Sequence, residues 1–220
     1  MGAAADGGQI AGAVPLTLTP VLGVVLAGGG ATRFGGAPKG LARVGGVRII
    51  DRVAGVLRTA CDDLLLVANA PDAAAWLPGV RVAADVRPGL GSLGGLHAAL
   101  AHAADVPVVV VAWDMPFVPA PLVAALRDAG DGGAAAVVPE SDDGPEPLCA
   151  YYAPACLAAA TRLLDAGERR ARALGAVVGA RRVGVTEVAR YGDPRVIFRN
   201  VNTPADLTAA EVLAASEPLA

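Results

Sequence analysis

The sequence predicts an α/β fold of three layers, in which helices cover both faces of a mostly parallel sheet. The apolar runs are continuous rather than alternating, which is typical of strands buried on both faces. These runs also alternate with helical patterns, as in successive strand–helix–strand units. At 220 residues and 54% hydrophobic content, the chain is long enough to bury such a core.

The first two thirds of the chain carry the regular part of this pattern. The expected strands are Val21–Ala27, Leu64–Ala68, Val80–Ala84, Val106–Trp113 and Ala134–Pro139. The expected helices between them are Arg48–Thr59, Leu93–Ala103 and Ala120–Ala129. Right-handed crossovers bring the strand C-termini to one edge of the sheet, where ligands of such sheets bind.

The last third of the chain departs from this regular alternation of strands and helices. The stretch "SDDGPEPLCAYYAP" is expected to form a loop and then a strand, followed by helices at Pro154–Ala166 and Glu168–Val178. "RVIFRNVNTPADL" predicts another strand and then a helix that begins at Thr203–Pro204, with Thr as cap and Pro in the first turn. Without a repeat or linker, we expect one domain over residues 21–215, after a flexible leader over residues 1–20.

The composition argues against several classes of protein. A net charge of −3 gives no general attraction to nucleic acid or to an anionic membrane, so neither is an expected partner. The longest apolar run is too short to span a bilayer, and the N-terminus lacks a basic region of the signal-peptide kind. Cys61, Cys149 and Cys156 are odd in number and have no CxxC spacing. We therefore expect reduced thiols in a cytoplasmic protein.

The stretch "LAGGGATRFGGAPKG" crowds glycines directly after the first expected strand. Glycine lets backbone N–H groups approach an anion closely and turn towards it. Arg33 and Lys39 add two full charges, and Lys39 is the only lysine in the chain. Where Arg serves for every other cation, a retained Lys indicates a compact point charge beside a phosphate. The stretch therefore predicts a triphosphate site.

Two familiar phosphate-binding motifs do not fit this stretch. The P-loop pattern fails because Lys39 is followed by Gly40 rather than by Ser or Thr. The dinucleotide fingerprint fails because Arg33 stands at its third glycine and because Asn69, not an acidic residue, follows the second strand. These departures disfavour a nicotinamide-dependent oxidoreductase.

Two carboxylates follow further strands at the same expected edge. Asp114, two residues before Pro116, is suited to hold Mg²⁺ that bridges phosphate oxygens. Asp85 precedes a glycine-rich loop and can accept a hydrogen bond from a base or a ribose. His97 and His102 lie in a helical pattern and are interpreted as ordinary helix residues.

The pattern L-A-G-G-x-x-x-R-x-G-G-x-x-K-G-L resembles the nucleotidyltransferases that activate small molecules with NTPs. Within them it is most similar to the MobA-type molybdenum cofactor guanylyltransferases. The resemblance spans roughly residues 22–210 and implies a Rossmann-like nucleotidyltransferase fold. The sequence departs from the family at Phe34 (usually Met), at Pro38 (often Asp) and at Trp113 (usually Cys).

The resemblance also implies roles for individual residues. The expected nucleotide-binding residues are Leu26, Ala27, Gly28, Gly29, Lys39, Asn69, Asp85 and Asp114. The expected catalytic residues are Lys39, Arg33 and Asp114, and Asp114 is also the expected ligand of the Mg²⁺ cofactor.

The acceptor site rests on three further matches. Asn200 and Asn202, in the family's N-x-N-T-P pattern, alternate on the expected strand and would hold metal or acceptor; turn and cap chemistry is the alternative. Arg169 and Arg170, in the family's G-E-R-R pattern, would meet an anionic pterin phosphate or a protein that hands it over; an exposed helix face is the alternative. "PEPLCAYY" is expected to line the acceptor pocket, with its aromatic rings against either a pterin or the core.

The implied reaction transfers GMP from GTP to the phosphate of molybdopterin or its molybdenum form and releases pyrophosphate. The attacking phosphate is already an anion and needs no general base, so the protein must neutralise repulsion and fix geometry. Open alternatives are CTP with the same pterin, another small phosphorylated acceptor such as a sugar or polyol phosphate, and a non-catalytic nucleotide-binding adaptor. Transient contact with proteins that deliver or receive the cofactor is a further expectation.

Overall fold

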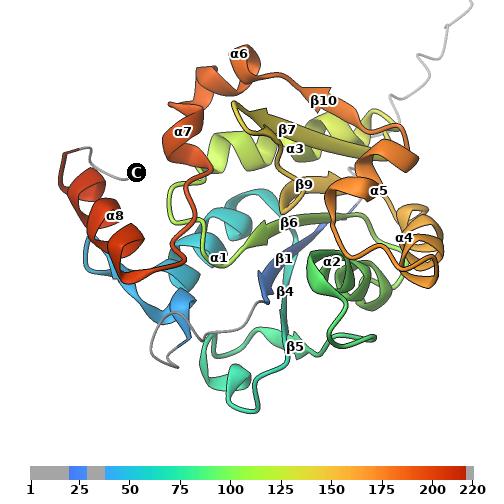
Figure 1. The fold of residues 1–220 in the computed structure, drawn as a ribbon, viewed down its shortest axis with the longest axis horizontal. Coiled ribbons are helices and arrows are strands. Elements are labelled where there is room, and N and C mark those ends of the chain that lie inside the picture. Colours follow the sequence, from blue (N-terminus) through green and yellow to red (C-terminus); the bar gives the residue numbers. More distant parts are fainter. Residues whose placement is uncertain (1–19, 29–37, 217–220) are drawn as a thin grey trace, which may run out of the picture.

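A mostly parallel sheet forms the centre of the fold (Figure 1). The structure is a computed structural model that describes residues 20–28 and 38–216. In this part of the chain the strand order is β10-β7-β9-β6-β1-β4-β5, and β8 pairs with β7 outside that row. The strands are β1 (Leu22–Ala27), β4 (Asp63–Ala68), β5 (Arg81–Ala83), β6 (Val108–Ala112), β7 (Ala136–Ser141), β8 (Gly144–Pro145), β9 (Cys149–Tyr152) and β10 (Arg181–Val183), and a separate hairpin joins β2 (Arg43–Val44) to β3 (Val47–Arg48).

The strand directions confirm the expected sheet. β1 lies between β4 and β6 and pairs in parallel with both. β4 pairs in parallel with β5, and β7 with β10, whereas β9 is antiparallel to β6 and β7. The carboxyl ends of β6, β1, β4 and β5 therefore meet at one edge of the sheet.

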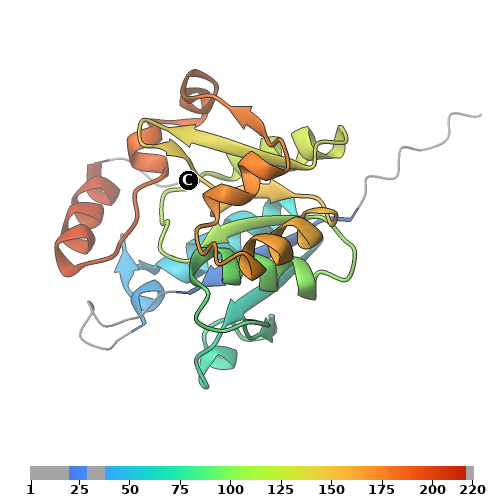
Figure 2. The ribbon, with the colours of Figure 1, turned by 45° about the vertical axis from the view of Figure 1, so that its right-hand side comes forward.

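Helices cover both faces of the sheet, which confirms the three expected layers (Figures 1 and 2). Alternate residues of β1 face opposite layers: Val25 is buried with Leu57 of α1, and Val24 with Leu96 of α2. α3 shares the layer of α1, and α4 that of α2. The helices are α1 (Ile49–Ala60), α2 (Gly91–His102), α3 (Ala120–Asp131), α4 (Cys156–Asp165), α5 (Arg172–Val177), α6 (Val185–Val188), α7 (Pro194–Ile197) and α8 (Pro204–Ser216).

The helix expected at Glu168–Val178 is wrong in its first turn, because α5 begins only at Arg172. The Glu168 carboxylate accepts hydrogen bonds from the backbone N–H groups of Arg169 (2.8 Å) and Arg170 (2.9 Å). Such local side-chain bonds to the backbone compete with helix formation. The two arginines therefore lie on a turn before α5, not on an exposed helix face.

The strand expected in "RVIFRNVN" is also wrong. Pro194–Ile197 forms the short helix α7, and residues 198–203 make an irregular connection to α8. The Asp193 carboxylate caps α7 by accepting from the backbone N–H of Arg195 at 2.9 Å, and Pro194 supplies the first helical residue. Asn200 and Asn202 therefore do not alternate on a strand.

The predicted start of the last helix at Pro204 is confirmed. Within residues 20–28 and 38–216, no helix is long and apolar enough to cross a membrane.

The three cysteines are unpaired, and burial raises the pKa of Cys61 to about 12 and that of Cys156 to about 11.

Candidate active site

The two described ends of the glycine-rich stretch, Gly28 and Pro38, line the same cavity at this edge of the sheet. The chain leaves this strand at Gly28 and returns at Pro38, where a 3-10 turn covers Lys39–Leu41. Gly29 and Arg33, which the sequence assigns to the site, lie outside the described residues.

Gly40, next to Lys39 in the chain, packs closely against the Trp113 ring. A Cβ added at Gly40 would lie 2.3 to 3.1 Å from three atoms of the Trp113 ring, where no side chain fits without a shift. The close contact requires glycine here and fixes the backbone next to the lysine.

Lys39, Asp114 and Asn202 meet although they come from three distant parts of the sequence. The Lys39 ammonium donates to Asp114 Oδ2 at 2.5 Å and to Asn202 Oδ1 at 2.7 Å. Asp114 follows β6 and is only 7% exposed. The backbone N–H of Val201 donates to the Asp114 carbonyl at 2.9 Å, which ties the irregular connection to the end of β6. The structure thus brings Asn202 to the predicted site without the strand that the sequence suggested.

The donor set around Lys39 suits a hard divalent cation only in part. Among the described residues, no cluster of three or more His, Cys, Asp or Glu side chains could hold a metal ion. The Asp114 carboxylate and the Asn202 amide offer oxygens of the kind that Mg²⁺ prefers, and Mg²⁺ commonly takes one or two carboxylates together with phosphate oxygens. The residues therefore fit a cation that is shared with a phosphate ligand.

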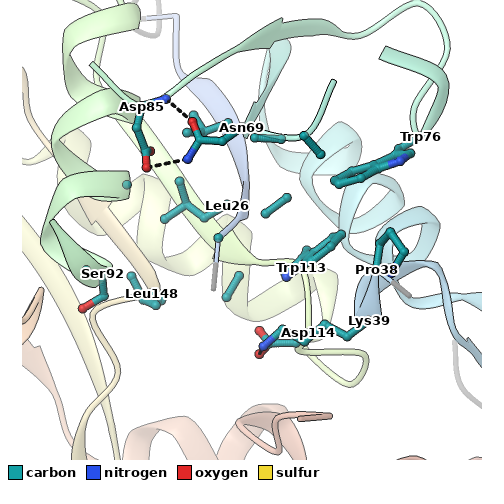
Figure 3. A pocket seen from close by; sticks show the side chains of 18 of the residues that line it. Leu26, Pro38, Lys39, Asn69, Trp76, Asp85, Ser92, Trp113, Asp114 and Leu148 are labelled. Carbon is teal, nitrogen blue, oxygen red and sulfur yellow. Dashed lines mark hydrogen bonds and ion pairs between the residues drawn. The ribbon is translucent and has the colours of Figure 1, made fainter. Parts of the chain in front are cut away.

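Asn69 and Asp85 form a second polar pair, at the ends of β4 and β5. The Asn69 amide donates from Nδ2 to Asp85 Oδ2, and its Oδ1 accepts from the backbone N–H of Asp85, both at 2.8 Å. This exchange fixes the orientation of both side chains (Figure 3). One carboxylate oxygen of Asp85 takes no part in it.

The Lys39–Asp114 pair and the Asn69–Asp85 pair line one cavity of about 900 Å³. Lys39 and Asp114 lie at one end of it, and Asn69 and Asp85 lie at the other (Figure 3). The volume suits a ligand the size of a nucleotide. The predicted nucleotide-binding residues that the structure describes all line this cavity: Leu26, Ala27, Gly28, Lys39, Asn69, Asp85 and Asp114.

Two tryptophans form a wall of the cavity that the sequence analysis did not assign to the site. The rings of Trp76 and Trp113 stack with their centroids 5.1 Å apart and their planes at 20°. The Trp113 indole nitrogen is buried and has no hydrogen-bond partner in the described part of the chain. The available signal was that these are the only two tryptophans of the chain: Trp113 directly follows β6, and Trp76 lies in the connection between β4 and β5.

A smaller cavity of about 290 Å³ adjoins the first and shares Ser92 and Leu148 with it. Asn200 and Arg170 line it, so two predicted acceptor residues lie here. Its remaining lining residues are Met115, Pro145, Glu146, Pro147, Ala171 and Arg172.

Arg169, unlike its neighbour Arg170, makes its contacts outside the two cavities. Its guanidinium donates to the carbonyls of Leu164 (3.1 Å) and Glu168 (2.9 Å), at the end of α4. The Arg169 carbonyl accepts from the N–H of Leu93 at 3.0 Å, at the start of α2. Arg169 therefore braces the two helices and does not line either cavity.

The tyrosines and histidines of the region belong to the packing. Tyr151 and Tyr152 are 5% and 0% exposed within the two core layers, so the core-packing alternative holds for both. His97 is buried in α2 beside Thr161, with 3.1 Å between Nε2 and Oγ1, and burial lowers its pKa. His102 contacts the Ala84 carbonyl at 3.0 Å.

Comparison with known proteins identifies the family. A family model described as the MobA-like NTP transferase domain matches residues 23–183. The chain belongs to this family.

The curated relatives of this MobA-like NTP transferase match it over most of their length. A molybdenum cofactor guanylyltransferase of Desulfosudis oleivorans is 34% identical over 192 residues, which cover 87% of this chain and 94% of the relative. A probable molybdenum cofactor guanylyltransferase of Deinococcus radiodurans is 39% identical over 194 residues, with 86% and 93% covered.

Solved structures agree on the MobA-like fold. Molybdopterin-guanine dinucleotide biosynthesis protein A from Archaeoglobus fulgidus superposes with a TM-score of 0.73 at 29% identity, covering 90% of this chain and all of that one. A Mycobacterium tuberculosis protein in complex with manganese has a TM-score of 0.64 at 22% identity, covering 88% and 99%, and shows the fold alone.

Proposed function

We propose that this protein transfers GMP from GTP to the phosphate of a molybdopterin-type acceptor and releases pyrophosphate. The observation that carries the proposal is that the two ends of the large cavity carry different polar groups. Lys39 lies at the end beside the glycine-rich stretch, and Asp85 with Asn69 lies at the opposite end. A nucleoside triphosphate matches this arrangement, because it has an anionic phosphate chain at one end and a hydrogen-bonding base at the other. The names of the curated relatives agree with this reaction.

The carboxylate of Asp85 favours guanine over cytosine. Guanine presents two adjacent N–H donors on its pairing edge, and a carboxylate accepts from both. Cytosine places an acceptor nitrogen beside its amino group, and that nitrogen would face a carboxylate oxygen. CTP is therefore the second candidate nucleotide.

The reaction needs charge neutralisation and alignment rather than a base. The acceptor phosphate attacks the α-phosphorus in line with the departing pyrophosphate. Lys39 supplies a compact positive charge, and Asn202 and Asp114 hold it in place. Arg33 is the second expected cation. A divalent cation, Mg²⁺ by expectation, bound at Asp114 would neutralise phosphate oxygens.

The acceptor is assigned to the smaller cavity, with Arg170 and Asn200 among its walls. The shared residues Ser92 and Leu148 make the two cavities neighbours, as a transfer between their ligands requires. We also propose that the reaction takes place in the cytoplasm and that other proteins deliver and receive the pterin by transient contact.

One incubation tests the proposal. The protein is mixed with Mg²⁺, molybdopterin and each NTP in turn, and the nucleotide attached to the pterin is identified by mass spectrometry. We expect the guanine dinucleotide and pyrophosphate with GTP. A cytosine product would support the second candidate. GTP binding without any pyrophosphate release would indicate that the protein is a non-catalytic nucleotide-binding adaptor.

A further inference from the structure

Glu146 is a carboxylate of the smaller cavity to which no role has been given. It lies between β8 and β9, and its backbone is fixed on both sides. Its N–H donates to the Pro139 carbonyl at 2.9 Å, and its carbonyl accepts from the N–H of Cys149 at 3.1 Å. Ser141 Oγ donates to Glu146 Oε1 at 2.7 Å. Within the described residues the other oxygen, Oε2, has no hydrogen-bond partner, so a half-buried carboxylate is held ready with one oxygen available.

The cavity that Glu146 lines has both apolar and cationic side chains in its walls. Pro145, Pro147, Leu148 and Met115 provide apolar walls. Arg170 and Arg172 line the same cavity, yet neither makes an ion pair with Glu146 in the part of the chain that the structure describes. Arg170 is bound to Glu168 through two hydrogen bonds of 3.0 and 2.9 Å. The cavity thus offers an acceptor group and a positive group that have not neutralised each other.

A ligand that suits this cavity combines three properties. It has a flat face for the apolar walls, an edge of N–H donors for the carboxylate, and an anionic group for the arginines. A sugar phosphate or polyol phosphate supplies the anion but neither the flat face nor the N–H edge. A pterin phosphate supplies all three, because the 2-amino-4-oxo ring presents adjacent N–H donors.

We propose that Glu146 determines the specificity for the acceptor by accepting hydrogen bonds from the 2-amino-4-oxo edge of a pterin. This inference rests on the proposed function, since it concerns the acceptor of that reaction. It also relates the two cavities. In each, a neighbouring polar side chain donates to one carboxylate oxygen: Asn69 to Asp85, and Ser141 to Glu146. Guanine and pterin present the same donor edge, so the protein would recognise both rings with the same arrangement, a carboxylate oriented by a neighbouring polar side chain.

The variant Glu146→Gln tests the role in turnover. Gln keeps the length of the side chain and an oxygen that can accept from Ser141, but it replaces one carboxylate oxygen by an amide donor. We expect KM for the acceptor to rise about 10- to 100-fold, the range of a hydrogen bond to a charged group, with KM for GTP unchanged. An unchanged acceptor KM would overturn the inference.

The matched control is Glu140→Gln. Glu140 lies on β7, pairs with Arg182 at 3.2 Å and lines neither cavity. Its substitution should leave both KM values unchanged. Thermal unfolding of both variants checks that each is folded.

A binding measurement separates this inference from the proposed reaction and needs no turnover. The probes are 6-carboxypterin and 6-carboxylumazine, which differ at position 2: the pterin carries an amino group there, and the lumazine carries an oxo group with a hydrogen on the neighbouring N1. By ligand fluorescence we expect the wild-type protein to prefer the pterin at least about tenfold, and Glu146→Gln to lose the preference. Equal binding of the two probes by the wild type would overturn the inference even if the variant did not fold. If the preference is present but no NTP yields a dinucleotide, the proposed reaction fails and the pterin site stands.

Discussion

Lys39 illustrates how much of this site depends on single residues. Its ammonium bonds to Asp114 and Asn202 at 2.5 and 2.7 Å, and the neighbouring Gly40 leaves no space for a side chain beside Trp113. A planar guanidinium is bulkier than an ammonium and cannot be placed as a point charge. The lysine is therefore specified by its surroundings and not only by its charge.

The substitution Lys39→Arg tests this requirement. We expect turnover to fall on the order of 10²-fold, as for the loss of one preorganised donor, while the unfolding temperature changes little. Steady-state release of pyrophosphate measures the effect. Arg43→Lys is the control, because among the residues that the structure describes the Arg43 side chain bonds only to the Gly46 carbonyl on the β2–β3 hairpin. Wild-type turnover in Lys39→Arg would refute the point-charge argument.

The substitution Gly40→Ala tests the packing that supports the lysine. A Cβ here meets the Trp113 ring, so we expect a loss of about 1–3 kcal/mol in the free energy of unfolding, the usual range for overpacking. Gly55→Ala is the matched control. Gly55 lies inside α1 with nothing within 4 Å of an added Cβ, and Ala should stabilise the protein by about 0.5–1 kcal/mol. Urea unfolding of both variants measures the two changes, and equal stability of the two would contradict the argument.

The sequence could predict those site residues that directly follow a strand. Asp85 and Asp114 were predicted in this way, because parallel strands bring their carboxyl ends to one edge. Lys39 was predicted as the only lysine of the chain, at the end of the glycine-rich stretch that follows the first strand. Asn202 was predicted for a wrong reason: it reaches Lys39 from an irregular segment held by the backbone of Val201. Trp76 matches no motif, and the folded chain places it in the wall of the large cavity. Glu146 belongs to the stretch "PEPLCAYY" that was expected to line the acceptor pocket, but it had no predicted role of its own.

At the scale of elements, sequence patterns describe least well the short segments in the last third of the chain. The turn at residues 168–171 is built by side-chain bonds from Glu168, and the Arg169 carbonyl accepts from the first turn of α2. α7 begins where Asp193 supplies a cap, so an apolar run that predicted a strand became a helix. β10 contains only three residues, two of them exposed arginines, and gave no apolar signal. Periodicity predicted the regular layers correctly but not segments whose conformation depends on individual hydrogen bonds.

The turn at Glu168 has a measurable pH signature. Side-chain hydrogen bonds from Arg170, together with the backbone N–H groups of Arg170 and Arg169, lower the pKa of Glu168 from 4.5 to about 2. A carboxyl group whose pKa is lowered on folding stabilises the fold above its unfolded pKa, and this contribution is lost as the pH falls towards 2. We therefore expect the turn to weaken between about pH 4.5 and pH 2.

Arg170→Gln separates the contributions to that signature. Removing the guanidinium should move the titration midpoint of Glu168 part of the way back towards 4.5, because the backbone donors remain. An NMR titration of the Glu168 carboxyl carbon measures the midpoint. A midpoint that stays near 2 in the variant would show that the guanidinium does not hold the carboxylate.

At the scale of the whole molecule, the sheet edge holds two cavities whose ligand groups can be changed independently. Asp85 lies in the large cavity only and Glu146 in the small cavity only, whereas Ser92 and Leu148 line both. The net charge of −3 gives no general attraction for anions, so binding depends on local cations such as Lys39 and Arg170. A nucleotide variant and an acceptor variant should therefore affect separate constants.

Asp85→Asn tests that independence from the nucleotide side. The Asn oxygen can still accept from Asn69, but the amide faces the donor edge of guanine with a donor of its own. We expect GTP to bind about 10- to 100-fold more weakly, with the acceptor KM unchanged. Tryptophan fluorescence can follow the binding without turnover, since the only two tryptophans of the chain stack in the wall of the large cavity. If GTP leaves the emission of the wild type unchanged, the nucleotide does not bind against this wall. If Asp85→Asn binds GTP as the wild type does, the base is not read by this carboxylate.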